Sequence, residues 1–98
     1  MIEAATVSEL REKKRKLIEI NGKKIALFFI SGEVFAVDSV CPHRGGPLDE
    51  GELNEYDIIC PWHGFTYDLK DGNCINMHGF KVNKYEIKLD GEKVLINL

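Results

Sequence analysis

The sequence predicts an all-β domain of short antiparallel strands. Apolar and polar residues alternate in several segments, and pairs of turn-forming residues separate these segments. Between residues 38 and 67 this alternation lapses, and Gly, Pro, Cys, His and acidic residues become frequent. We therefore expect a small β scaffold that holds long functional loops.

A meander of three strands is predicted in the first half of the chain. Asn21-Gly22 supplies the positive φ angles that a tight hairpin turn needs. The predicted strands and turns are residues 16–20, Asn21-Gly22, residues 24–30, Ser31-Gly32 and residues 34–38.

The two ends of the chain have their own signals. Residues 85–89 and 94–98 alternate with a period of two on either side of Asp90-Gly91, which predicts a hairpin with one buried face. Near the N-terminus, Thr6 and Glu9 have the spacing of a capping box, which predicts a short helical turn over residues 6–10.

Length and composition indicate one small soluble domain over residues 1–98. Apolar residues make up 44% of the chain, and the net charge of −3 argues against binding to nucleic acid. The longest apolar run, residues 25–30, is far shorter than the roughly 18 residues that cross a bilayer. With no secretory leader visible, we expect a cytoplasmic protein without a membrane anchor.

Two segments in the loop-rich region contain candidate metal ligands. Cys41 and His43 form a C-x-H motif, and Cys60 and His63 form a C-x-x-H motif. Each segment offers one thiolate and one imidazole, which suits a dinuclear iron-sulfur centre in which the thiolates hold one iron and the imidazoles the other. A single structural zinc is the alternative, although its ligands usually occur as a cysteine pair followed by a histidine pair.

At these residues the sequence closely resembles the Rieske [2Fe-2S] family. The resemblance implies a small antiparallel β-sandwich or barrel-like domain with two cluster-binding loops at one tip. It also implies one [2Fe-2S] cluster per chain, with Cys41 and Cys60 on the inner iron and His43 and His63 on the outer iron. The matching segments are residues 34–38, the first box Cys41-Pro42-His43-Arg44-Gly45-Gly46-Pro47-Leu48, the second box Cys60-Pro61-Trp62-His63-Gly64, and residues 65–72.

Departures from the membrane-anchored respiratory members point to the soluble, disulfide-lacking branch of the family. Those members have a disulfide between the positions held here by Gly46 and Trp62. They also have a hydroxyl, which bonds a bridging sulfide, at the position of Phe65. Neither interaction can form in this chain, so the resemblance is to the soluble Rieske-type ferredoxins.

Other positions bear on the surroundings of the cluster. Tyr67 keeps the family's second hydroxyl, which the resemblance makes a donor to the sulfur of Cys41. The proline usual in a third, shielding loop is absent, and we expect residues 77–80 to take its place. Cys74 is interpreted as a small buried side chain. Trp62 is interpreted as a residue that packs under its loop, and a docking surface is the alternative.

The implied function is that of a soluble one-electron carrier. It would pass electrons from a flavin-dependent reductase to a terminal oxygenase or another acceptor, and it would not itself be an enzyme. His78 is the only histidine outside the two boxes, too few for the mononuclear iron site of an oxygenase. The alternatives are a small subunit of a larger oxidoreductase such as a nitrite reductase, or a zinc-stabilised interaction module.

Charge near the boxes suggests how a partner is recognised. Residues 41–63 contain five acidic residues and one arginine, which gives a balance of −4. We expect this acidic collar to steer a basic partner surface toward the cluster. Its members are Asp49, Glu50, Glu52, Glu55 and Asp57.

Overall fold

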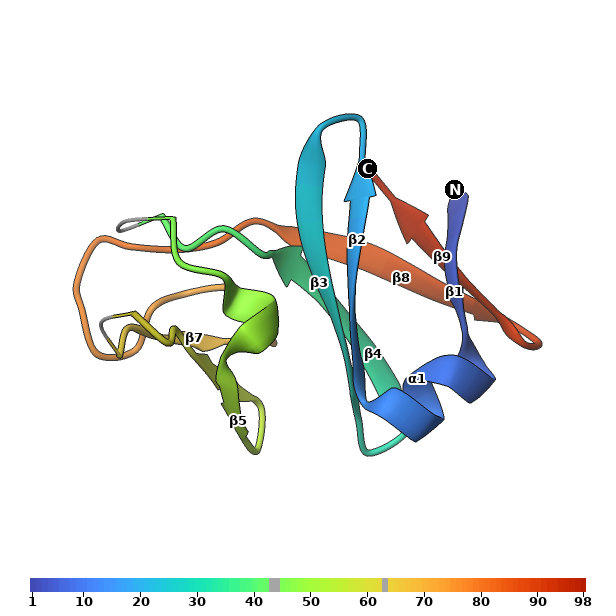
Figure 1. Ribbon diagram of the computed structural model, residues 1–98, viewed down its shortest axis with the longest axis horizontal. Coiled ribbons are helices and arrows are strands. Elements are labelled where there is room, and N and C mark those ends of the chain that lie inside the picture. The colour runs from blue at the N-terminus through green and yellow to red at the C-terminus, as the bar shows by residue number, and fades with distance from the viewer. Residues whose placement is uncertain (43–44, 63) are drawn as a thin grey trace.

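The larger sheet of the computed structural model has six strands in the order β1-β9-β8-β4-β3-β2, and every pairing is antiparallel. The model describes residues 1–42, 45–62 and 64–98 (Figure 1). The strands are β1 (Ile2–Thr6), β2 (Arg15–Ile20), β3 (Lys23–Ile30), β4 (Glu33–Asp38), β8 (Lys84–Asp90) and β9 (Lys93–Asn97).

The predicted meander and C-terminal hairpin are confirmed. In the first turn Asn21 and Gly22 have φ angles of 52° and 77°, as the Asn-Gly signal requires. The pairing of Asp90 with Lys93 closes the last hairpin, so its turn consists of Gly91 and Glu92, one residue later than predicted.

A second, smaller sheet lies where the sequence analysis expected only loops. Its strands are in the order β5-β6-β7, with β5 (Glu52–Asn54), β6 (Asp57–Ile59) and β7 (Thr66–Asp68). A short 3₁₀ turn, η1 (Leu48–Glu50), precedes it. The expectation was wrong because strands of three residues are too short to show a period of two.

The predicted capping box starts a helix, α1 (Val7–Lys13). The hydroxyl of Thr6 accepts a hydrogen bond from the main-chain N–H of Glu9 at 3.2 Å. The helix is longer than predicted and ends where Lys14 adopts a left-handed conformation with a φ of 72°.

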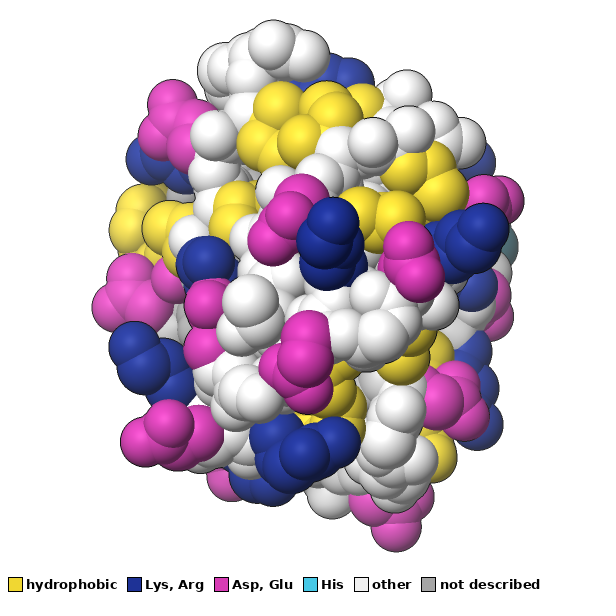
Figure 2. All heavy atoms as spheres, turned by 90° about the vertical axis from the view of Figure 1, so that its right-hand side faces the viewer, with side chains coloured by type: hydrophobic (Ala, Val, Ile, Leu, Met, Phe, Trp, Pro, Cys, Tyr) yellow, Lys and Arg dark blue, Asp and Glu magenta, His cyan; other side chains and the backbone are white. Residues whose placement is uncertain are grey.

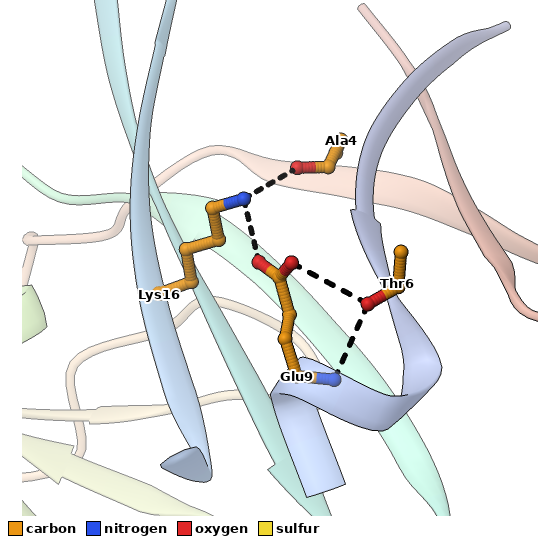
Figure 3. Close-up of polar contacts among 4 residues, drawn as sticks. All are labelled: Ala4, Thr6, Glu9 and Lys16. Carbon is orange, nitrogen blue, oxygen red and sulfur yellow. Dashed lines mark hydrogen bonds and ion pairs between the residues drawn. The ribbon is translucent and has the colours of Figure 1, made fainter. Parts of the chain in front are cut away.

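Side chains close the gap between the two edge strands of the larger sheet. Lys16 on β2 forms an ion pair of 2.6 Å with Glu9 on α1, and it donates a hydrogen bond to the carbonyl of Ala4 on β1 at 3.4 Å (Figure 3). The ammonium of Lys16 also lowers the pKa of Glu9. These contacts bridge the two edges of a nearly closed barrel.

Two apolar clusters lie on opposite faces of β3. Ile25 and Leu27 pack inside the barrel against α1 and β9. Ala26 and Phe28 face the other cluster, which extends to the small sheet. This second cluster includes Cys41, Cys60 and Tyr67, so the wall of the barrel is also the floor of the candidate site.

The face of the molecule at β1 and β9 points away from the small sheet. Acidic and basic side chains are interspersed there, with hydrophobic side chains gathered near its upper edge (Figure 2). Among residues 1–42, 45–62 and 64–98, no helix has the length and apolar character to cross a membrane.

Candidate metal centre

The two boxes have the same backbone design. In each, the N–H of the cysteine donates to the carbonyl five residues later, and its carbonyl accepts from the N–H of a glycine four residues later. The hydrogen bonds are Cys41 N to Gly46 O (2.9 Å), Gly45 N to Cys41 O (2.7 Å), Cys60 N to Phe65 O (2.7 Å) and Gly64 N to Cys60 O (3.1 Å).

The glycines that close these two turns have left-handed conformations. Gly45 has a φ of 77° and Gly64 a φ of 73°, which other residues adopt at a cost. Both cysteine residues are 2% exposed. The repeated turn therefore places one buried thiol in each box.

The first box is anchored by polar contacts at its two ends. The buried hydroxyl of Ser39, ahead of the box, donates to the carboxylate of Asp49 at 2.7 Å. The guanidinium of Arg15 donates to the carbonyls of Asp49 and Gly51 at 2.9 and 2.6 Å. Asp49 is therefore part of the scaffold, and Arg15 places a positive charge beside the acidic residues.

The boxes meet at Gly46. A Cβ atom at this position would lie 2.7 Å from Cys60 Sγ and 3.2 Å from Trp62 Cγ. Such distances are too short for any side chain, so only glycine allows the first box to pack this closely against the sulfur of Cys60. The structure thus brings the backbone of the first box directly against the buried thiol of the second.

Tyr67 supports the other sulfur. Its hydroxyl lies 3.3 Å from Cys41 Sγ, within hydrogen-bonding distance for sulfur, and the side chain is fully buried. Burial, followed by the hydrogen bond to Cys41, raises the pKa of Tyr67 well above its usual value. The hydroxyl keeps its proton and can donate it to the sulfur, as the resemblance implied.

His43 and His63 lie outside the described residues, so the structure does not test the four-ligand prediction. What it brings together are the two predicted cysteine ligands and Tyr67, in one apolar cluster. Two buried thiols, that of Cys60 lying against Gly46, each in a box that also contains a histidine, fit a metal centre with sulfur and nitrogen ligands.

The third loop, residues 74–80, lies against the second box. The phenyl rings of Phe65 and Phe80 stack edge to face with centroids 5.2 Å apart. His78 is exposed, and Cys74 is half buried rather than fully buried as expected. The thiol of Cys74 donates to the side-chain carbonyl of Asn76 at 3.3 Å.

Sequence reasoning missed Asn76. Its side chain donates to the carbonyl of Gly64 at 2.8 Å and accepts from the N–H of Thr66 at 3.0 Å. An asparagine in a loop usually forms hydrogen bonds with residues next to it in the sequence. The sequence around Asn76 therefore does not predict hydrogen bonds to residues ten or twelve positions away.

Large apolar side chains surround the boxes at the surface. The ring of Trp62 lies against Gly46. The side chain is nevertheless 55% exposed, which corrects the interpretation that it packs under its loop. The other exposed apolar residues next to the boxes or on the third loop are Val40, Ile75 and Met77.

The barrel, the small sheet and the paired cysteine turns define a Rieske-type domain. Residues 1–86 match the model of the Rieske [2Fe-2S] domain, and the chain belongs to this family. The predicted family and fold class are therefore confirmed. Membership also implies the predicted [2Fe-2S] cluster as the cofactor.

Individual relatives refine this result. The chain is 29% identical over 98 residues to the ferredoxin component of the naphthalene 1,2-dioxygenase/salicylate 5-hydroxylase systems of a Ralstonia species, covering 99% of this chain and 94% of that protein. It is 32% identical to human apoptosis-inducing factor 3, but it spans only 16% of that protein's length.

The fold is also found in a solved structure of a ferredoxin. The ferredoxin of carbazole 1,9a-dioxygenase from Nocardioides aromaticivorans superposes with a TM-score of 0.86 at 22% identity, covering 97% of this chain and 94% of that one. The agreement extends over nearly the whole of both chains.

Proposed function

We propose that this protein is a Rieske-type ferredoxin, a one-electron carrier that accepts an electron from a flavin-dependent reductase and delivers it to a terminal oxygenase or a similar acceptor. The observation that supports this most directly is the pair of buried cysteines in matching turns. The near full-length likeness to a ferredoxin component gives independent support.

The proposed ligands are the four residues predicted from the sequence. The thiolates of Cys41 and Cys60 hold the inner iron, and the imidazoles of His43 and His63 hold the outer iron. When bound, the cluster stores one electron reversibly, and its neutral imidazole ligands raise its potential above that of an all-thiolate cluster. Tyr67 donates a hydrogen bond to Cys41, which stabilises added negative charge.

In this proposal acidic residues near the boxes recognise the partner. Only some members of the predicted acidic collar can take part. Glu52 pairs with Ile59, next to Cys60, whereas Asn54 and Asp57 pair at the far end of the β5-β6 hairpin. The hairpin therefore takes Glu55 and Asp57 away from the boxes. Glu50 and Glu52 are exposed and remain close enough to steer a basic partner.

A permanently bound subunit of a larger oxidoreductase is the second candidate. The exposed side chains of Val40, Trp62, Ile75 and Met77 favour it, because stable interfaces have apolar centres. The two candidates differ in whether the protein is isolated alone or with a partner.

We further propose a single domain in the cytoplasm. The shared wall between the two apolar clusters favours one domain. Cys41, Cys60 and Cys74 form no disulfide, which fits a reducing compartment.

The experiment is to purify the protein anaerobically and measure iron, labile sulfide and the electron paramagnetic resonance (EPR) spectrum after reduction. We expect about two irons and two sulfides per chain and a Rieske-type signal. Cys41→Ser or His63→Ala should abolish the signal, whereas Cys74→Ser should retain it. Stoichiometric zinc without sulfide would show a zinc module, and co-purification with a stoichiometric partner would favour the subunit.

A further inference from the structure

At its start the third loop is joined to β7 by the bridge between Cys74 and Tyr67 and by the hydrogen bond from Ile75 N to the carbonyl of Thr66 at 2.8 Å. Its ends are joined by the hydrogen bond from Cys74 N to the carbonyl of Phe80 at 3.0 Å, and the bridge between Asn73 and Lys81 lies just outside. Residues 75–79 between these ends are all exposed. Beyond this short main-chain anchor, contacts made by individual side chains help to position the rest of the loop.

Asn76 supplies side-chain hydrogen bonds between this loop and the second box. Its amide group donates to Gly64 O and accepts from Thr66 N, at 2.8 and 3.0 Å. The thiol of Cys74 donates to the same side-chain oxygen at 3.3 Å. Donor and acceptor of one amide group thus clamp the chain on both sides of Phe65.

The clamped residue, Gly64, directly follows His63 in the sequence. Its N–H donates to Cys60 O at 3.1 Å. Its carbonyl accepts from Asn76 and, at 3.2 Å, from the hydroxyl of Thr66. Both backbone polar groups of this left-handed glycine are therefore held, which leaves its peptide units little freedom to rotate.

We infer that Asn76 is a positioning residue for the second box, fixing the backbone from which His63 binds the outer iron. The inference rests on the proposed function. Among the described residues, the hydrogen bonds of Asn76 go to Gly64, Thr66 and Cys74, and not to the predicted ligands Cys41 and Cys60. Asn76 therefore acts on the second box through Gly64. The side-chain amide of Asn76 thus rigidifies the third loop, as a proline would do at this place.

Two substitutions of Asn76 separate the parts of this clamp. Asn76→Ala removes all three hydrogen bonds. Asn76→Asp keeps the shape and the acceptor for Thr66 N, but it cannot donate to Gly64 O. Asn73→Ala and Asn73→Asp are matched controls, because Asn73 is exposed at the base of the same loop.

The measurements are the g-values of the reduced protein by EPR and the rate at which visible absorbance is lost on warming. Loss of an outer-sphere contact to a metal ligand typically weakens metal binding by about 10-fold or more. We expect both Asn76 variants to lose the cluster about 10-fold faster and to show shifted or broadened g-values. Both Asn73 variants should match the wild type.

Wild-type g-values and bleaching rates in both Asn76 variants would overturn the inference, as would equal effects in the Asn73 variants. If Asn76→Ala fails to fold, the near-isosteric Asn76→Asp decides the question. Failure of the proposed function looks different, because the wild-type protein would then lack a Rieske-type signal.

Discussion

Gly46 and Trp62 are in contact across the two boxes: a Cβ atom on Gly46 would lie 3.2 Å from Trp62 Cγ. By family resemblance, these are the positions at which the respiratory members have a disulfide. In this protein a covalent bond between the boxes is replaced by an aromatic ring packed on a bare backbone.

The first prediction concerns this contact. Gly46→Ala would place a methyl group 2.7 Å from Cys60 Sγ, so the sulfur must shift. We expect a clear loss of bound iron and sulfide per chain, measured by chemical analysis. The control is Gly91→Ala, at a left-handed turn with no atom within 4 Å of the added Cβ, which should lower stability but leave iron content unchanged. Normal iron content in Gly46→Ala would refute the claim that only glycine fits beside the sulfur of Cys60.

The second prediction concerns the hydrogen bond between Tyr67 and Cys41. Tyr67→Phe removes a donor to the sulfur and should lower the reduction potential, because the added electron is less well stabilised. One such bond is worth about 1 kcal/mol, or roughly 40 mV for one electron. Protein-film voltammetry measures the shift. Tyr56→Phe, which alters a half-buried tyrosine packed on Phe35, is the control and should leave the potential unchanged.

The third prediction concerns stability at alkaline pH. Tyr85 donates a 2.6 Å hydrogen bond to Asp38, and burial together with this bond raises its pKa from 10.0 to about 12. The folded protein therefore holds this proton more tightly than the unfolded chain. The resulting stabilisation is complete below pH 10 and is lost as the pH rises toward 12.

The measurement is the free energy of unfolding of wild type and Tyr85→Phe in denaturant from pH 8 to 12. Below pH 10 their difference should be constant, and above it the wild type should lose at most roughly 3 kcal/mol relative to the variant. A difference that stays constant through pH 12 would show that Tyr85 has an ordinary pKa.

The fourth prediction concerns partner recognition. The double variant Glu50→Gln and Glu52→Gln should slow association with the redox partner about two- to fivefold at low salt, with little effect on the dissociation rate. Stopped-flow kinetics at increasing ionic strength measures this. Glu33→Gln with Glu55→Gln removes the same charge from turns remote from the boxes and should have a much smaller effect. Equal effects of the two double variants would assign steering to net charge alone.

Local signals made much of this protein predictable. The Asn-Gly turn, the capping box at Thr6 and the alternation on either side of Asp90 depend on residues close together in sequence, and the structure confirms each of them. The two boxes were equally readable, because metal ligation restricts both the residue types and their spacing.

Contacts between distant residues had to come from the tertiary structure. Lys16 bridges the two edges of the barrel and Asn76 bonds to Gly64, yet neither residue differs in sequence from an ordinary surface or turn residue. The sequence alone determined the turns, the hairpins of the larger sheet and the residues offered as ligands, but not the small sheet. The packing of the third loop on the second box decided how the backbone beside those ligands is held, because that depends on which segments meet in space and not on neighbours along the chain.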